Sequence, residues 1–396
     1  MKKLVSLALI LTLVLVGMFA GTASAEVTKD TIKVGLILLH DENIGYDEIH
    51  LNGFMDMVKN LGLTEDQYVI KYNIPENELC YDAAVDLAEA GCNIIFADSF
   101  GHESYMLQAA TEYPDIQFCH ATGYQAASSG LDNLHNFMPS VYESRYVSGI
   151  VAGLKLAEVY GADTDAKIGY VGAFSYAEVV SGYTAFFLGV RSICPNVTME
   201  VKYTGSWADQ ATEREVAQAL IEGGCVLISQ HADTTGAASA CEELGVWHVG
   251  YNVGMIDTAP NTTLTSASLK WGPDYAFFVN ALINGEELPA DRSDGYESDA
   301  VWITELNEKT IAAGTQEAVD AAVAAIKDGT LHVFNNATFT VNGETVTSTA
   351  DIEGFYGVEH MVTDESGVTY FAEQDGFAAP AFSLRIDGIT ELNTVY

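Results

Sequence analysis

The feature that most constrains the fold is a set of strand-like segments that occurs twice in the chain. Lys33-Val-Gly-Leu matches Lys167-Ile-Gly-Tyr, 134 positions later. Val69-Ile-Lys-Tyr matches Glu200-Val-Lys-Tyr, 131 later, and Gly91-Cys-Asn-Ile-Ile matches Gly224-Cys-Val-Leu-Ile, 133 later. Matches at a nearly constant spacing and in the same order predict two similar lobes. Buried parallel strands also resemble one another in composition, so an accidental likeness is the alternative.

Apolar runs alternate with helical patterns along the whole chain. Strands are expected over 32–39, 68–72, 93–97, 116–121, 135–138, 246–250 and 263–270, and helices over 47–61, 81–89, 273–283 and 315–327. This alternation is typical of a parallel sheet flanked by helices. The fold class is therefore α/β, with one such sheet in each lobe. After residue 327 we expect a Gly- and Thr-rich tail with short strands.

The order of these segments suggests where the lobes begin and end. Residues 1–25 form a signal peptide, residues 26–141 with about 262–288 form lobe 1, and residues 142–261 with about 289–396 form lobe 2. A chain that returns to the first lobe after the second makes several connections at the hinge. The segment 141–160 joins the lobes, and its Gly149 and Gly153 would let a helix pack closely on its neighbour.

The composition excludes several classes of protein. Hydrophobic residues make up 48% of the 396 residues, which is enough for a core and excludes a disordered chain. The formal net charge is -38, so a nucleic acid or an anionic membrane surface would be repelled. We expect a small-molecule ligand and no nucleic-acid partner.

The N-terminus has the pattern of a secretory signal peptide. Lys2 and Lys3 precede an apolar run, and Ala23-Ser-Ala25 forms an A-x-A cleavage site before Glu26. A single membrane anchor is the alternative, because the run is near the lower length limit for a spanning helix. Met18 stands where a lipoprotein signal would have cysteine, so no lipid anchor is expected. The mature protein is expected to be extracytoplasmic, with no direct membrane insertion.

The six cysteines favour buried free thiols. No pair is spaced as C-x-x-C, which argues against a zinc knuckle or a redox pair. Cys92, Cys119 and Cys225 lie in or beside apolar strands. Export would also permit disulfides, which remain the alternative.

Polar and aromatic residues gather where the expected strands end. Ligands of open parallel sheets bind beyond the carboxyl ends of the strands. The candidate ligand-binding residues are Asp41, Tyr46, Ser99, Phe100, Trp207, His231, Asn252, Lys270 and Trp271. Aromatic faces combined with directional polar groups suit a flat neutral ligand such as a purine or nucleoside. Each residue also has a purely structural interpretation: the aromatic residues at the edge of the core, and His231 as a helix cap.

Motifs for catalysis, metals and cofactors are absent from the sequence. There is no phosphate-binding loop, dinucleotide fingerprint, zinc-protease helix or nucleophile elbow. Acidic pairs are too numerous for one to stand out as an acid–base couple. We therefore expect no enzyme, no cofactor, no catalytic residue and no metal site.

Several segments occur in one order that resembles the basic membrane protein family of ABC-transporter substrate-binding proteins. They are Ile94-Ile-Phe-Ala-Asp-Ser-Phe-Gly, Tyr146-Val-Ser-Gly-Ile-Val-Ala-Gly, Lys167-Ile-Gly-Tyr-Val-Gly, Gly205-Ser-Trp-Ala-Asp, Gly250-Tyr-Asn and Leu264-Thr-Ser-Ala-Ser-Leu-Lys-Trp-Gly. The resemblance extends from about residue 32 to 283. It implies a type I periplasmic-binding-protein fold whose lobes close on a ligand, and an ABC permease as partner.

The resemblance also implies a purine base or purine nucleoside as ligand. Tyr46 corresponds to the family's first-loop aromatic residue, and Ser99-Phe100 to its strand-end pair. Asn252 and Lys270 correspond to the aspartate and lysine that hold ribose hydroxyls in nucleoside binders. Asn252 in place of aspartate removes a charged acceptor, which leaves a free base open.

Two other functions remain open at this point. One is an enzyme, such as a hydrolase acting on a small molecule in the same cleft. The other is a chemosensory receptor for a sugar or another small solute. The absence of a nucleophile–base motif favours the uptake receptor over the enzyme.

N-terminal sequencing tests the expected export signal. Because the A-x-A site directs cleavage before Glu26, we expect the exported protein to start at that residue. An intact Met1 or a lipid-modified product would contradict a free, cleaved protein.

Overall fold

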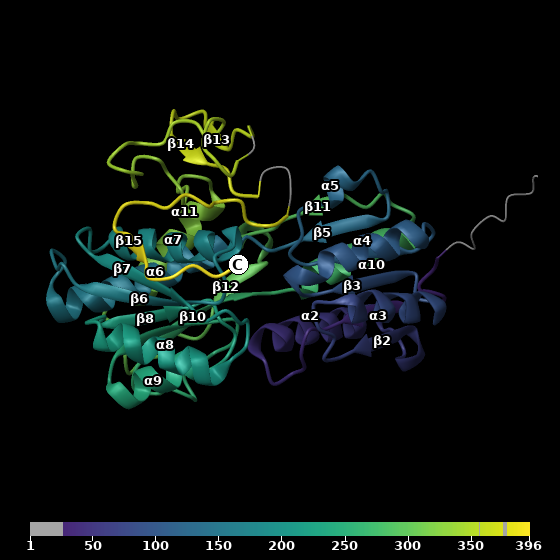
Figure 1. The fold of residues 1–396 in the computed structure, drawn as a ribbon, viewed down its shortest axis with the longest axis horizontal. Coiled ribbons are helices and arrows are strands. Elements are labelled where there is room, and N and C mark those ends of the chain that lie inside the picture. The colour runs from purple at the N-terminus through teal and green to yellow at the C-terminus, as the bar shows by residue number, and fades with distance from the viewer. Residues whose placement is uncertain (1–26, 356, 375–377) are drawn as a thin grey trace, which may run out of the picture.

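Each of the two lobes is built around a mostly parallel sheet, and the lobes lie side by side (Figure 1). This computed structural model describes residues 27–355, 357–374 and 378–396. The expected signal peptide and its cleavage position before Glu26 lie outside the described residues.

The first sheet has the strand order β11-β5-β4-β3-β1-β2, and all its neighbouring strands are parallel. Its strands are β1 (Val34–Ile37), β2 (Tyr68–Lys71), β3 (Ile94–Ala97), β4 (Gln117–His120), β5 (Leu134–Phe137) and β11 (Asp291–Arg292). Its helical elements are α2 (Gly45–Leu61), η1 (Glu65–Gln67), α3 (Glu78–Glu89), η2 (Phe100–His102), α4 (Glu103–Glu112), α5 (Ala126–Ser129) and α10 (Gly272–Asn284). Helices α2 and α10 pack together on one face, and α3 and α4 cover the other.

The second sheet has the order β12-β10-β9-β8-β6-β7-β15, and only β12 runs antiparallel to its neighbour. Its strands are β6 (Lys167–Gly172), β7 (Thr198–Tyr203), β8 (Leu227–Gln230), β9 (Trp247–Tyr251), β10 (Thr263–Leu269), β12 (Val301–Ile303) and β15 (Ile389–Glu391). Its helical elements are α6 (Val141–Tyr160), α7 (Ala177–Arg191), α8 (Gln210–Glu222), α9 (Gly236–Leu244), η3 (Tyr296–Ser298) and α11 (Thr315–Lys327). Helices α6 and α7 lie on one face, and α8 and α9 on the other. A predicted α/β fold with two helix-flanked parallel sheets is thus confirmed.

The pairing of the strands repeats with the spacing found in the sequence. Gly35 of β1 pairs with Val69 and Ile95, and Gly169 of β6 pairs with Glu200 and Ile228. The differences are 134 for the glycines (169 − 35), 131 for the first partners (200 − 69) and 133 for the second (228 − 95). Equal register in both sheets confirms that the lobes are repeats rather than accidental look-alikes.

Two predicted lobe boundaries are wrong at their edges. The sequence placed residues 262–288 in lobe 1, but β10 pairs with β9 and β12 of the second sheet, and only α10 returns to pack on α2. Residues from 289 onward were placed in lobe 2, but β11 pairs with β5 of the first sheet. In each case the open edge of a neighbouring strand supplies the backbone hydrogen bonds that a buried strand requires. The chain crosses between lobes at 138–140, 270–271 and 293–295.

Helices α6 and α7 touch backbone to backbone. A Cβ atom added to Gly149 would lie 2.1 Å from the carbonyl oxygen of Phe186, and one on Gly189 would lie 2.1 Å from that of Tyr146. A Cβ on Gly153 would lie 2.9 Å from the carbonyl oxygen of Val190. The predicted close packing at Gly149 and Gly153 is therefore present, with α7 as the partner helix.

All six cysteines fall in the described residues, and all are buried free thiols, as expected. Burial raises the pKa of Cys92 to about 11 and that of Cys225 to about 12.

The tail contains the hairpin β13 (Met361–Thr363) and β14 (Thr369–Phe371), and it ends beside β7. Within the described residues, we find no helix with the length and apolar character needed to cross a membrane.

The α6–α7 contact predicts a large effect of one methyl group. Gly149→Ala forces two backbones apart, so we expect it to lower the free energy of unfolding by about 2–3 kcal/mol, in the range of an overpacked core. Gly254→Ala is the control, because its added Cβ meets only one atom, at 4.0 Å. Urea unfolding of both variants provides the measurement. Equal stabilities would contradict the close contact.

Candidate functional site

One cavity of about 20 Å³ lies between the lobes, at the carboxyl ends of both sheets. It is lined by Leu39, Tyr46, Asp47, Ser99, Phe100, Thr122, Glu178, Trp207, His231, Asp233 and Tyr251. About 10–15 Å³ is enough for one water molecule, so the lobes or their side chains must move to admit a larger solute.

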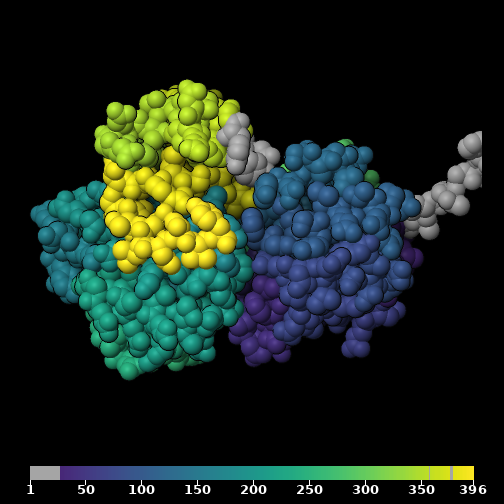
Figure 2. All heavy atoms as spheres, in the orientation of Figure 1, coloured from purple at the N-terminus to yellow at the C-terminus, as the bar shows by residue number. Residues whose placement is uncertain are grey.

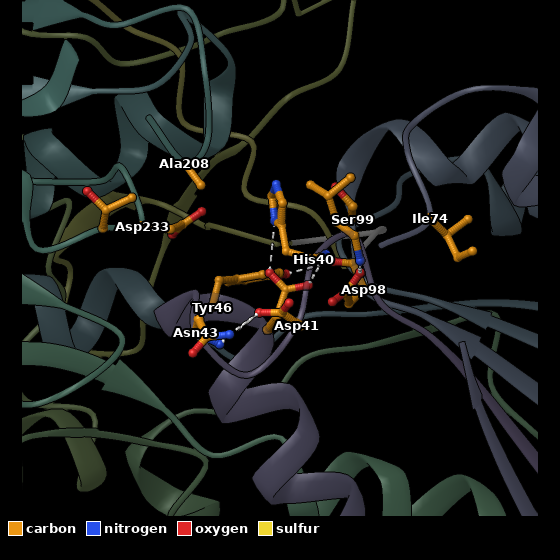
Figure 3. A network of polar contacts seen from close by, with 12 residues as sticks. His40, Asp41, Asn43, Tyr46, Ile74, Asp98, Ser99, Ala208 and Asp233 are labelled. Atoms are coloured by element: carbon orange, nitrogen blue, oxygen red, sulfur yellow. Dashed lines mark hydrogen bonds and ion pairs between the residues drawn. The ribbon is translucent and has the colours of Figure 1, made fainter. Parts of the chain in front are cut away.

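The first lobe contributes residues from α2 and from the ends of β1, β3 and β4. The hydroxyl of Tyr46 donates to the carbonyl oxygen of Asp98 at 2.9 Å, which fixes the ring at the floor of the cavity. Beneath it, the Asp98 carboxyl accepts from the backbone N–H of Leu39. Ser99 donates to Glu76 at 2.6 Å. Figure 3 shows Tyr46, Asp98 and Ser99 of the first lobe, with Asp233 of the second lobe across from them.

The second lobe contributes Glu178 from the first turn of α7 and residues at the ends of β7, β8 and β9. His231 Nε2 lies 3.2 Å from a carboxylate oxygen of Glu178. Burial and the nearby charge of Arg145 together lower the pKa of His231 to about 4, although the hydrogen bond to Glu178 acts in the opposite direction. Arg145 is fully buried behind the cavity, with its guanidinium carbon 3.7 Å from the ring centroid of Tyr251. The imidazole is therefore neutral at neutral pH.

Asp233 is held deep in the cleft. Asn252 donates to its carboxyl at 2.8 Å. Burial raises the pKa of Asp233 well above its ordinary value, and the nearby carboxyls of Glu213, Asp47 and Glu178 act in the same direction. Burial likewise raises the pKa of Asp98, and the nearby carboxyl of Asp47 raises it as well.

Three contacts join the lobes across the cavity. Thr122 donates to the second carboxylate oxygen of Glu178 at 3.2 Å. The backbone N–H of Gly45 donates to the carbonyl oxygen of Asp233 at 3.4 Å. The ring of Phe100 stacks on Tyr176 of the second lobe, with centroids 5.0 Å apart. The cleft is thus closed by one buried polar bond, one backbone bond and one aromatic pair.

The structure brings five of the nine candidate residues to this cavity: Tyr46, Ser99, Phe100, Trp207 and His231. Asp41, Asn252, Lys270 and Trp271 do not line it. Asp41 accepts from Asn43 within its own loop (Figure 3). Trp271 is buried in the core of the first lobe, where its ring stacks on that of His50 with centroids 3.8 Å apart.

Lys270 and Asn252 lie elsewhere than the ribose contacts would require. Lys270 pairs with Asp299 at 2.6 Å. It lines a separate groove of about 760 Å³ on the side of α2 and α10, together with Asn252, Trp271 and Trp302. Asn252 is buried beneath Asp233 and holds its carboxyl in place.

The remaining residues that line the cavity were missed by sequence reasoning. Asp47 and Glu178 stand in the first turns of helices that follow the first strand of each lobe, where an acidic residue also stabilises the helix end. That shared position was the available signal. Asp233 and Tyr251 are close neighbours of the residues chosen, His231 and Asn252.

The charge of the cleft restricts what it can bind. Asp47, Glu178 and Asp233 line the cavity, and no lysine or arginine is among its lining residues. An anionic ligand would find no cationic side chain among these lining residues, whereas N–H and O–H groups find carboxyl oxygens that accept hydrogen bonds. Among the described residues, no group of three or more His, Cys, Asp or Glu side chains is arranged to hold a metal ion.

Comparison with known proteins identifies a family and two relatives that match this chain. Residues 41–328 match the family of PnrA-like ABC transporter substrate-binding proteins (Bmp). A purine-binding protein of Brucella abortus (strain 2308) is 33% identical over 68% of this chain and 73% of its own length. A putative ABC transporter glucose-binding protein of Haloferax volcanii is 34% identical over 54% of this chain, but over only 50% of its own length.

Solved structures share the architecture. A solute-binding protein of an ABC transporter system from Conexibacter woesei has a TM-score of 0.61 at 21% identity, covering 76% of this chain and 98% of its own. One from Aeropyrum pernix has a TM-score of 0.63 at 15% identity, covering 76% and 93%. The two lobes therefore have the type I periplasmic-binding-protein fold.

The buried His231 predicts a pH dependence of stability. The folded-state pKa of about 4 lies below the ordinary 6.5. The unfolded chain therefore binds a proton between these values that the folded chain does not, and stability falls as pH falls through this range. In His231→Gln the side chain does not titrate. Between pH 7.5 and 5, the free energy of unfolding of wild type should therefore fall by about 2 kcal/mol more than that of His231→Gln.

Chemical unfolding of both proteins at the two pH values gives the comparison. The buried carboxyl groups titrate in both proteins, so their contributions largely cancel in the difference. Parallel losses of stability would mean that His231 titrates normally in the folded protein.

Proposed function

Because the chain belongs to the family of PnrA-like ABC transporter substrate-binding proteins, we propose that it binds a purine base or purine nucleoside between its lobes for uptake. It would act outside the cytoplasm, as a receptor that delivers its ligand to an ABC permease.

The observation that carries this proposal is the pairing of aromatic faces with carboxyl acceptors in one cavity. Phe100 and Trp207 offer flat apolar surfaces, and Glu178 and Asp233 offer acceptors for N–H groups. A purine has both a flat ring and N–H donors at its edge, and stacking a base on an aromatic ring contributes about 1–3 kcal/mol. The absence of cationic lining residues disfavours a nucleotide, whose phosphate would meet the three carboxyls. The purine-binding relative from Brucella abortus supports the same ligand class.

The placement of Lys270 favours the base over the nucleoside. Lys270 is paired with Asp299 in the groove outside the cavity, and Asn252 is committed to Asp233. Neither of the two groups expected to hold ribose hydroxyls therefore faces the ligand. A nucleoside would have to place its ribose on the carboxyls themselves.

A sugar is the second candidate ligand. The putative glucose-binding relative from Haloferax volcanii favours it, and carboxylates beside an aromatic ring also suit sugar hydroxyls and the apolar face of a sugar ring. A direct test must therefore include glucose beside the purines.

Binding, rather than catalysis, is the function proposed. The family and the structural neighbours are solute-binding proteins. Hydrolysis of a nucleoside would release free ribose during a titration with adenosine or inosine, so that product distinguishes the enzyme.

Calorimetric titration with adenine, hypoxanthine, adenosine, inosine and glucose tests the proposal. Phe100→Ala removes an aromatic face, so we expect both purine bases to bind more weakly by about 1–3 kcal/mol. Lys270→Ala is the matched control, because its side chain lies outside the cavity, and it should leave the affinity for bases unchanged.

Other results would change the assignment in defined ways. A loss in Lys270→Ala confined to nucleosides would restore its ribose role and with it a nucleoside ligand. Binding of glucose alone would select the sugar receptor, and binding of none of these ligands would refute the purine proposal.

A further inference from the structure

The chain continues well beyond the part that matches the family. The match ends at residue 328, and the described residues that follow pack on the second lobe. Figure 2 shows this tail, in yellow-green and yellow, covering the second lobe and reaching its border with the first. Part of the tail crosses that border. We call this part the strap and define it as Glu373, Gln374 and Ala378–Phe382.

The strap is fixed to the second lobe by a buried carboxyl. Glu373 accepts from the hydroxyl of Ser181 on α7. It also accepts from the backbone N–H groups of Ala381 at 3.1 Å and Phe382 at 2.7 Å. The Phe382 ring is buried and stacks on Phe334 with centroids 4.2 Å apart. A carboxyl with three donors and a core aromatic residue therefore hold both ends of the strap, Glu373 and Phe382, on the second lobe.

Gln374 bonds the strap to a crossover between the lobes. Gln374 accepts from the hydroxyl of Ser140 at 2.9 Å. Its amide donates to the carbonyl oxygens of Met138 at 3.0 Å and Ala378 at 2.6 Å. Met138 and Ser140 lie between β5 and α6, where the chain first passes from one lobe to the other. One side chain therefore ties both parts of the strap to the hinge.

Ala378 and Ala379, which lie between the two ends of the strap, are bonded to the first lobe. The backbone N–H of Ala378 donates to the carboxyl of Asp291 at 2.7 Å. The backbone N–H of Ala379 donates to the carbonyl oxygen of Gly123 at 3.0 Å. Ala378 is fully buried in the core of that lobe.

The strap is bonded to each lobe directly behind the contact that closes the cleft. Gly123 follows Thr122, and Ser181 lies one helical turn after Glu178 on α7. Thr122 and Glu178 are the residues that bond across the cavity. Parting the lobes at this bond would therefore also separate Gly123 from Ser181 and pull on the strap.

We propose that the strap is a conformational restraint that holds the lobes together and shifts the balance between open and closed forms toward the closed form. It acts on the hinge, so it does not depend on which solute the cleft binds. A restraint that favours the binding-competent form raises apparent affinity by the population it adds. The proposal thus goes beyond the proposed function and is testable without a ligand.

Distance measurements between spin labels test the strap directly. Labels at Leu79→Cys and Leu244→Cys report on the two lobes, because these residues are 53% and 46% exposed and the six native thiols are buried. Asp291→Ala removes one of the two hydrogen bonds between the strap and the first lobe. Asp387→Ala is the matched control, because Asp387 bonds Thr340, Asn342 and Gly343 within the tail.

We expect Asp291→Ala without ligand to gain a population at a different inter-lobe distance from wild type, and Asp387→Ala to match wild type. Adenine, used as the probe, should bind Asp291→Ala roughly three- to tenfold more weakly, the effect of about one hydrogen bond. If Asp291→Ala fails to fold by circular dichroism, Ser140→Ala removes one of the two bonds between Gln374 and the crossover and decides in the same way.

A distance distribution equal to that of wild type in the folded variant would overturn the restraint. Failure of adenine to bind any protein would refute the purine proposal alone, since the label distances need no ligand.

Discussion

The contact between α6 and α7 positions Glu178, through which the second lobe bonds to the first across the cleft. Glycine backbones meet there, at Gly149 and Gly189, so the axis of α7 cannot shift without a clash. Helix α7 carries Glu178 into the cavity and, one turn later, Ser181 beneath the strap. A single tight helix pair therefore holds both the residue that bonds to the other lobe and the residue that anchors the tail. Because α6 begins directly after the first crossover, this contact also links the hinge to the site.

The cleft gathers carboxyl groups in a place where water is scarce. Asp98 and Asp233 are buried, and burial raises the pKa of each. Such groups are retained where they are hydrogen-bonded or where a ligand supplies donors. The carbonyl oxygen of Asp98 accepts from Tyr46, and its carboxyl accepts from the backbone N–H of Leu39. The carboxyl of Asp233 accepts from Asn252. A neutral ligand with several N–H or O–H groups would complete the acceptors that the protein leaves facing the cavity.

The two lobes are alike in their sheets but differ in what is added at the edges. Five strands follow the same order in each sheet, β5-β4-β3-β1-β2 in the first and β10-β9-β8-β6-β7 in the second. The register of β1, β2 and β3 is repeated in β6, β7 and β8. The first sheet then gains β11, and the second gains β12 and β15. These added strands come from the segments that cross between lobes or from the tail. The asymmetry of the molecule thus lies in the connections and the tail, and these are the parts that join the lobes.

The sequence alone determined the elements, the repeat and the edge at which the site lies. Hydrophobic periodicity identified α11 over the same residues as the structure, and the constant spacing of the repeats predicted two equivalent sheets. Strand ends also identified Tyr46, Ser99, Phe100, Trp207 and His231, since the carboxyl ends of parallel strands share one edge.

Only the tertiary structure decided which way side chains turn and which distant segments meet. Lys270 and Trp271 also follow a strand, but the chain crosses to the other lobe there, so one turns to Asp299 and the other enters a core. Glu373 bonds to Ser181, which lies 192 positions away. Local periodicity carries no information about such pairs, because they form only when both lobes and the tail have packed and each buried polar group must find a partner.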